Sequence, residues 1–292
     1  MSKRADDVAG DPGGRPLLGL LSHAVLVTVA VVVLYPVLWV VRMALSPTQS
    51  FASGLSPIPS DVTLANFKDV VGHHDVAGTW VFGHQLWNSL IIATATAVVG
   101  VALATSAAYA FSRFRFPGAK LGMGALLVTQ MFPATMMMIP LYILLDKLGL
   151  LDSQFGLVLV YATTSIPFST WMLKGYFDTI PIELEEAARM DGASTSKIFF
   201  SIILPLARPA IAITALFSFM TAWNEFILAA KLMNSETSYT LPVVLQGYVG
   251  AKSTAWGHFA AGAILVSLPV MALFFALQKH LVGGLTAGSV KG

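Results

Sequence analysis

The sequence predicts an all-α, polytopic membrane protein with six transmembrane helices, and three observations carry this prediction. Of the 292 residues, 56% are hydrophobic and only 11% are charged, whereas soluble domains carry about 25% charged residues. The apolar residues gather into six long segments that turn residues or charges separate. Lysine and arginine are spread unevenly over the connections between these segments, which is typical of proteins that obey the positive-inside rule.

Each segment is long enough to cross a bilayer, because a hydrocarbon core of about 30 Å needs roughly 20 apolar residues. The first segment exceeds the core of a signal peptide, about 7–15 residues, and is interpreted as a retained helix. The expected spans are residues 17–45, 86–111, 121–145, 155–177, 204–230 and 259–281. They form one domain over residues 17–282, between an N-terminal tail at 1–16 and a C-terminal tail at 283–292.

Two features indicate how the spans pack. The second span is rich in alanine and glycine, and such small residues let helix backbones approach closely in lipid. Prolines such as Pro133 and Pro167 lie inside other spans, where each removes a backbone donor and kinks the helix.

The charges predict the orientation. If the N-terminus is cytoplasmic, all but five of the 17 lysines and arginines lie on the cytoplasmic side. The five exceptions are Arg42, Lys68, Lys147, Lys231 and Lys252. The positive-inside rule therefore predicts that both termini and the charged loop at 178–205 are cytoplasmic.

The loop at 178–205 reads as two short helices. Asp178, Thr179 and Pro181 predict a helix start, because short polar residues cap helices and proline fits the first turn. Gly192 is placed to end that helix in a left-handed conformation. Residues 194–196 start the second helix, and Pro205 marks the turn into the fifth span.

The same loop carries a spaced pattern, which is Glu-Ala-Ala from Glu186, three residues, Gly192, nine residues, and Ile-x-Leu-Pro ending at Pro205. It resembles the signature loop of the permease subunits of ABC importers. The resemblance implies the type I importer permease fold and a helix that docks into a cleft on an ATPase subunit. The coupling positions that match are Glu186, Ala187, Ala188 and Gly192, with Glu185, Arg189, Met190 and Asp191 as flanking contacts.

Other stretches are similar to the second permease subunit of maltose-type sugar importers. They include Trp223-Asn224-Glu225-Phe226, residues 241–245, Trp256-Gly257 and the ending at 281–292. This resemblance implies uptake of a di- or oligosaccharide of the maltose or trehalose kind across the cytoplasmic membrane. The implied partners are a second permease chain forming a heterodimer, two copies of an ATPase subunit and an extracytoplasmic sugar-binding protein.

The chain itself is expected to bind no cofactor. No Gly-Lys dipeptide occurs, so the phosphate-binding loop of P-loop ATPases is missing. ATP and Mg²⁺ are therefore expected on the partner ATPase subunits. No basic run argues for nucleic acid, and the absence of cysteine excludes cysteine-based metal sites and nucleophiles.

Two further sets of side chains are candidate sites. Glu225 lies inside an expected span, where a carboxylate must face protein or water, so it lines a sugar pathway or pairs with the partner chain. Gln130, Trp223 and Asn224 are the other pathway candidates, although tryptophans also fix helices at the membrane interface. Gln246, Tyr248 and Trp256 either contact the binding protein or pack within their loop.

Two other classes of function compete with this interpretation. An ion-coupled secondary transporter usually places ionisable groups near the bilayer middle, and here the spans offer chiefly Glu225. ATP-independent transport by the isolated chain would favour this alternative. A membrane enzyme with a metal at His73-His74 lacks the usual ligand spacing, and solvated loop histidines are the simpler interpretation.

Overall fold

The structure, a computed structural model, describes residues 16–51, 56–59, 61–250 and 254–287. Within these ranges the regular elements are helices, and the only β-pairing consists of two isolated bridges. Four helices are long and apolar enough to cross a membrane, namely α1 (Pro16–Leu45), α3 (Val81–Arg113), α6 (Gln154–Phe177) and α13 (Trp256–Ala287). Two bent helix pairs pass the same test, so the described ranges hold up to six spans.

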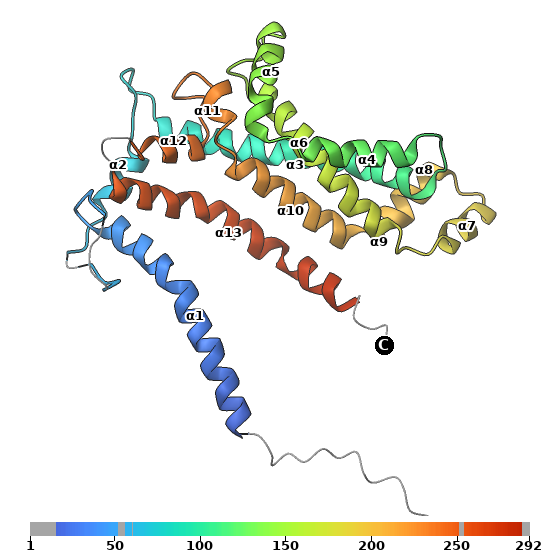
Figure 1. The fold of residues 1–292 in the computed structure, drawn as a ribbon, viewed down its shortest axis with the longest axis horizontal. Coiled ribbons are helices and arrows are strands. Elements are labelled where there is room, and N and C mark those ends of the chain that lie inside the picture. Colours follow the sequence, from blue (N-terminus) through green and yellow to red (C-terminus); the bar gives the residue numbers. More distant parts are fainter. Residues whose placement is uncertain (1–15, 52–55, 60, 251–253, 288–292) are drawn as a thin grey trace, which may run out of the picture.

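The remaining helices are short, and they lie at the two ends of the long ones (Figure 1). One end carries α7 and is called the α7 end here, and the other carries α2, α11 and α12. The short helices are α2 (Ala65–Val71), α7 (Glu183–Met190), α8 (Thr195–Ile198), the π-helical turn η1 (Phe199–Ile203), α9 (Leu204–Leu206), α11 (Ala229–Leu232) and α12 (Leu241–Gly247).

The third expected span, residues 121–145, is not one straight helix. It consists of α4 (Ala119–Gln130) and α5 (Ala134–Lys147), whose axes differ by 102°. Pro133 lies at the break with ψ 134°. Because proline lacks an N–H and disfavours the helical conformation of the residue before it, Phe132, the hydrogen-bond ladder is interrupted there.

The fifth expected span, residues 204–230, is shorter than its hydropathy predicts. The spanning helix is α10 (Arg208–Asn224), and the helical turns from Thr195 to Leu206 meet it at 77°. Glu225 ends α10 in an extended conformation. Its carboxylate accepts hydrogen bonds from the backbone N–H groups of Leu228 and Ala229, so it starts a new helical turn instead of continuing α10.

The small residues of α3 pack against α6, as the sequence predicts. Buried alanines and a glycine recur along one face of α3, at Ala93, Ala97, Gly100, Ala104 and Ala108. A Cβ atom added to Gly100 would lie 2.8 Å from Ser165 Oγ on α6. The glycine therefore leaves room for the Ser165 hydroxyl, which a larger side chain would displace.

Helix α1 stands apart from the other long helices over most of its length (Figure 1). Its apolar side chains are exposed from Leu20 to Leu38, and burial begins only in the last turn, at Met43 and Ala44. In water this surface would be unfavourable, so lipid or another chain must cover it.

Several expectations concern residues that lie wholly or partly outside the described ranges. The expected N-terminal tail, residues 1–16, lies outside the described residues except for Pro16. Helix α13 continues to Ala287, into the expected tail at 283–292, and residues 288–292 lie outside the described ranges. Lys252 falls in 251–253, which are also outside them.

Candidate functional site

Helix α7 ends at the glycine that the sequence predicts. Gly192 has φ +80°, in the left-handed region. Its N–H donates to the carbonyl oxygen of Arg189 at 3.0 Å, and the N–H of Ala193 donates to Ala188 at 2.9 Å. These two bonds form a Schellman motif, which satisfies the last carbonyls of the helix. The predicted left-handed turn is confirmed.

The start of α7 differs from the sequence prediction. The helix begins at Glu183, and its N-cap residue, Ile182, provides no side-chain hydrogen bond. Asp178 is instead the C-cap residue of α6, where its carboxylate contacts Lys174 Nζ at 2.6 Å and accepts from Ser112 Oγ at 2.6 Å. Burial opposes the charged form of Asp178, but these bonds outweigh it and hold its pKa below the ordinary value. The polar residues therefore join α6 to α3 rather than capping α7.

One face of α7 is attached to the body of the protein through a buried carboxylate. Glu185 is fully buried. Its Oε2 accepts a hydrogen bond from the Tyr109 hydroxyl at 2.9 Å, and its Oε1 lies 2.5 Å from Arg113 Nε. Arg189, one turn further along α7, lies 3.5 Å from Oε2. A buried carboxylate requires such partners, so Glu185 joins α7 to the end of α3.

Arg113 extends this attachment to a third segment. The exposed fraction of its side chain is 7%, and its Nη2 donates to the carbonyl oxygen of Ile180 at 2.9 Å. Its Nη1 donates to Ser112 Oγ at 3.0 Å, and that hydroxyl donates to Asp178. The charged network of Tyr109, Ser112, Arg113, Asp178 and Glu185 thus connects α3, the end of α6 and α7. We call it the α7 attachment network.

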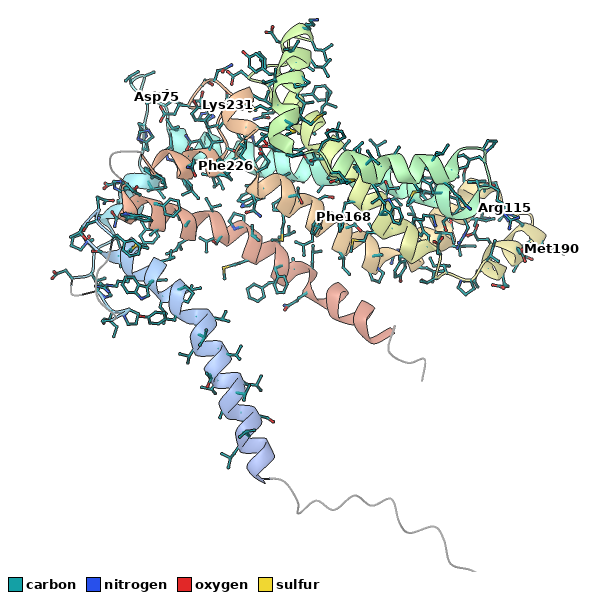
Figure 2. The ribbon with its side chains drawn as sticks, viewed as in Figure 1. Asp75, Arg115, Phe168, Met190, Phe226 and Lys231 are labelled. Atoms are coloured by element: carbon teal, nitrogen blue, oxygen red, sulfur yellow. The ribbon has the colours of Figure 1, made fainter. Side chains whose placement is uncertain are left out.

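The opposite face of α7 is open. Glu186, Ala187, Asp191 and Gly192 are exposed, and the exposed fraction of Met190 is 90%. Figure 2 shows Met190 at the extremity of the molecule. Ala188 is half-buried and packs against the apolar cluster below the helix. The expected coupling positions therefore fall into two groups. Glu185 and Ala188 face the rest of the protein, and the other positions are exposed and available to a partner.

The turns after α7 join it to α10. Ser194 caps α8 by accepting a hydrogen bond from the backbone N–H of Lys197 at 3.3 Å. Ile198 and Ile203 are fully buried beside the ends of α3 and α6, in the same apolar cluster as Phe177. The turns that follow α7 are therefore packed against the ends of α3 and α6, in the same cluster as Ala210 of α10.

The four pathway candidates do not come together at one surface. Trp223 is buried and stacks on Phe219, with ring centroids 5.4 Å apart. Asn224 is exposed and donates to the carbonyl oxygen of Met220. Of the Glu225 carboxylate oxygens, Oε2 lies 2.6 Å from the Tyr161 hydroxyl on α6. Glu225 thus bonds within this chain, at the end of α10 rather than inside a span.

Gln130 lies beside a cavity of about 650 Å³ at the α4–α5 break. It is the last residue of α4, and its amide donates to the carbonyl oxygen of Thr164 on α6 at 3.0 Å, three residues before Pro167. Thr129, Thr163 and Thr164 add hydroxyl-bearing side chains to an otherwise apolar lining. Leu228, whose N–H Glu225 binds, also lines this cavity.

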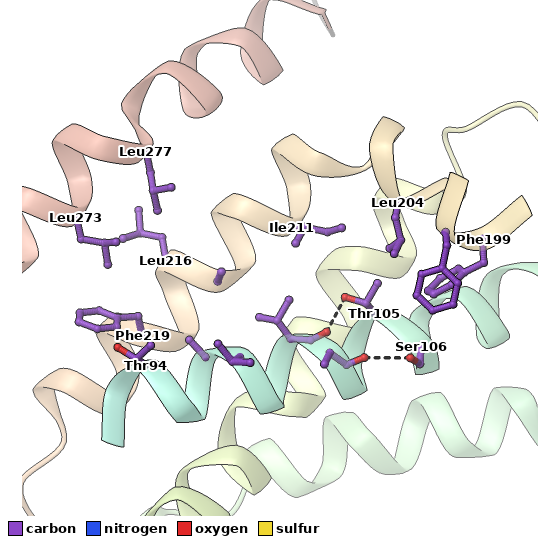
Figure 3. Close-up of a pocket in the computed structure, with 16 residues that line it drawn as sticks. Thr94, Thr105, Ser106, Phe199, Leu204, Ile211, Leu216, Phe219, Leu273 and Leu277 are labelled. Atoms are coloured by element: carbon purple, nitrogen blue, oxygen red, sulfur yellow. Dashed lines mark hydrogen bonds between the residues drawn. The ribbon is translucent and has the colours of Figure 1, made fainter. Parts of the chain in front are cut away.

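A second cavity, of about 640 Å³, is apolar (Figure 3). It lies between α3, α10 and α13, and Leu216, Leu273 and Leu277 point into it. The hydroxyls of Thr105 and Ser106 donate to carbonyls of their own helix. This lining suits hydrocarbon rather than a sugar.

Gln246, Tyr248 and Trp256 lie at the end of the molecule opposite α7. Gln246 is exposed, whereas Tyr248 is half-buried with its ring 5.7 Å from that of His258. Trp256 packs edge-on against Phe51 at 5.1 Å. Burial raises the pKa of Tyr248, with smaller contributions from Glu236 and Asp69. Only Gln246 presents its side chain openly to a partner.

The described residues contain no group of three or more His, Asp or Glu side chains that could hold a metal ion. His73 pairs with Glu236 at 2.8 Å, and His74 bonds to the carbonyl oxygen of Gly72.

The sequence analysis missed Tyr109 and Arg113. They lie four positions apart on α3, so both reach the same side of that helix. A tyrosine and an arginine at this spacing, at the end of an apolar span, are the signal that would have revealed them.

Comparison with known proteins agrees with this geometry. Residues 100–286 match the family described as the binding-protein-dependent transport system inner membrane component. The chain is 39% identical over 276 residues to the galactooligosaccharide permease GanQ of Bacillus subtilis, covering 94% of this chain and 95% of GanQ. It is 37% identical to the maltose/maltodextrin permease MalG of Yersinia pestis, covering 96% of each. A bacterial ABC transporter that imports alginate has a chain of similar structure, with TM-score 0.73, 26% identity, and coverage of 90% of this chain and 95% of that one.

Proposed function

The chain belongs to the family of binding-protein-dependent transport system inner membrane components, and from this premise we propose that it is a permease subunit that imports a di- or oligosaccharide, driven by ATP. The named relatives GanQ and MalG support a sugar of the galactooligosaccharide or maltose kind. The trehalose permease SugB of Mycobacterium tuberculosis, 37% identical over 89% of this chain, supports a sugar of the trehalose kind. In this proposal the chain pairs with a second permease, two ATPase subunits and an extracytoplasmic binding protein.

The observation that carries the proposal is the two-sided geometry of α7. Its outer face, with Glu186, Ala187 and Met190, is exposed. Its inner face is fixed to α3 and α6 by the α7 attachment network. An element that is open on one side and attached by buried charges on the other can pass a rigid-body displacement from a docked ATPase to the spans.

The sugar pathway is proposed to pass the cavity at the α4–α5 break. Gln130 and the threonine hydroxyls there offer donors and acceptors for sugar hydroxyls. Trp223 is too deeply buried to stack on a sugar in this conformation. Glu225 serves the pathway indirectly, because its carboxylate fixes the turn at Leu228, which lines the cavity.

The distribution of charge supports one orientation of the chain in the membrane. Arg115 lies toward the α7 end and Lys231 toward the other (Figure 2). We propose that the α7 end and both termini are cytoplasmic, where ATP and Mg²⁺ are available to the partner subunits. Gln246 then lies on the side that faces the binding protein.

The test is reconstitution in lipid vesicles with the partner permease, the ATPase and the binding protein. We expect sugar uptake only with ATP and loaded binding protein. Uptake by the permease chains alone, driven by an ion gradient, would contradict the proposal and support an ion-coupled transporter. No uptake of maltose, trehalose or galactooligosaccharide, with normal uptake of another class of solute, would contradict the sugar assignment.

A further inference from the structure

A groove between α4, α6 and the end of α3 is not used by the proposed transport function. Its volume is about 540 Å³. One part of its lining is apolar or aromatic, with Phe111, Met123, Leu127 and Trp171, and the other part carries Lys120 and Lys174. Such a combination of hydrocarbon surface and positive charge matches an amphiphile with an anionic head.

The groove lies at the α7 end of the spans. Lys174 contacts Asp178, which bonds to Ser112 at the end of α3, so the charged part lies beside the α7 attachment network. Trp171 is partly exposed, and its indole N–H donates to the carbonyl oxygen of Met123 at 3.3 Å. Tryptophans and lysines at this level mark the boundary between hydrocarbon and headgroups.

Of the two lysines that line the groove, Lys174 is neutralised by an acid and Lys120 is not. Asp178 is paired with Lys174, and Glu185 with Arg113. Lys120 forms no ion pair within the part of the chain that the structure describes. Lys120 also borders an adjoining hollow of about 570 Å³ that Arg115 lines, so a second cation is close to the same mouth.

The apolar part of the groove has room for an acyl chain. Gly124 lines it, and a Cβ atom added there would meet nothing within 4 Å. A free phosphate has no apolar part that could contact this lining, and the hydroxyls of a sugar would find few hydrogen-bond partners in it. An anionic phospholipid uses both parts of the groove.

We infer that this groove binds one anionic phospholipid, with the phosphate at Lys120, at the mouth that Arg115 also borders, and an acyl chain beside Gly124 and Leu127. The lipid belongs to the cytoplasmic leaflet if the proposed orientation holds. It would then lie against both α4 and α6, next to the network that holds α7, and would stabilise the packing of α4 on α6.

The test is native mass spectrometry of the complete detergent-solubilised transporter, incubated with equal amounts of phosphatidylglycerol and phosphatidylcholine. We expect the wild type to retain phosphatidylglycerol preferentially. Lys120→Gln should weaken this preference about fivefold, as expected for one lysine near an anionic lipid. Lys120→Arg should keep it, and Lys197→Gln, which removes an exposed lysine outside the groove, should leave it unchanged.

A second pair of variants tests the acyl part. Gly124→Leu should reduce retention of both lipids, whereas Gly175→Leu, on α6 with equal free space but outside the groove lining, should not. The inference is wrong if Lys120→Gln retains the wild-type preference, if millimolar inorganic phosphate displaces the lipid, or if a cysteine placed at Gly124 crosslinks to the partner permease instead. These measurements need no knowledge of orientation or transport, so their failure leaves the proposed function standing.

Discussion

At the scale of single residues, Glu185 shows how position on a helix decides a role. It is adjacent to Glu186 in a run of acidic residues, yet one carboxylate is fully buried and the other exposed. The difference arises because Tyr109 and Arg113 bond to the carboxylate of Glu185 and not to that of Glu186. Tyr109 is 76 positions away from Glu185 in the chain, and Arg113 is 72 positions away. No local pattern in residues 183–192 contains that information.

Removal of one member of this buried pair should be costly. Glu185→Gln leaves Arg113 charged and without its carboxylate, and breaking a buried ion pair in this way costs about 3–5 kcal/mol. We expect a lower thermal stability of the purified complex, with ATP hydrolysis no longer tied to sugar uptake. Glu186→Gln, at the exposed neighbour, should change stability by no more than about 0.5 kcal/mol.

The double variant Arg113→Met with Glu185→Met separates stability from coupling. Apolar replacement of a buried ion pair is often neutral for stability, so the melting temperature should recover. If the charges also fix the direction of α7, the ratio of sugar molecules imported to ATP hydrolysed stays below the wild-type ratio. Recovery of both quantities would show that only packing matters at this position.

Gly192 is a residue whose role the sequence does reveal. Because φ is +80° there, Gly192→Val forces a β-branched residue into the left-handed region, which costs roughly 1–2 kcal/mol or more. We expect loss of ATPase association in a pull-down of the solubilised complex, with normal membrane insertion. Gly192→Asn is the matched control, because asparagine tolerates this conformation, and wild-type assembly of the Val variant would contradict the prediction.

At the scale of elements, hydropathy predicts where spans lie but not how they bend. The free energy of transferring about 20 apolar residues into lipid is a sum over the segment. Composition therefore locates the helices. The 102° break between α4 and α5 depends on which side chains satisfy the freed backbone groups. Pro133 marks the position of the break, whereas the direction depends on tertiary contacts such as Gln130 with Thr164.

Gln130→Leu tests whether the contact between Gln130 and Thr164 holds the α4–α5 break against α6. Loss of one hydrogen bond of this type costs about 1 kcal/mol, so the complex should still assemble. We expect sugar uptake to fall while ATPase association remains normal. Thr129→Val provides a comparison in the same cavity, because its hydroxyl bonds only to the carbonyl oxygen of Leu126 on its own helix. Equal uptake by Gln130→Leu and wild type would remove Gln130 from the proposed pathway.

At the scale of the whole molecule, the two ends of the spans carry different elements. Helix α7 lies at one end, while α12 and the start of α13, which carry Gln246, Tyr248 and Trp256, lie at the other (Figure 1). The sequence alone predicts that the two ends differ, because the hydrophobicity of each span and the number of lysines and arginines in each loop are sums over residues. The placement of α1, largely exposed and apart from the other spans, depends on surroundings that one chain does not contain.

Single-cysteine labelling tests this polarity directly, because the native chain has no cysteine. A membrane-impermeant maleimide added to intact cells should label exposed Lys231→Cys and half-buried Asp75→Cys, which lie at the end opposite α7 (Figure 2). It should not label Met190→Cys or Ser194→Cys until the membrane is permeabilised. The reason is the charge distribution, since the cytoplasmic leaflet side retains short loops rich in lysine and arginine. Labelling of Met190→Cys in intact cells would place α7 outside, where no ATP-hydrolysing subunit could reach it, and would overturn both the orientation and the proposed coupling to ATP.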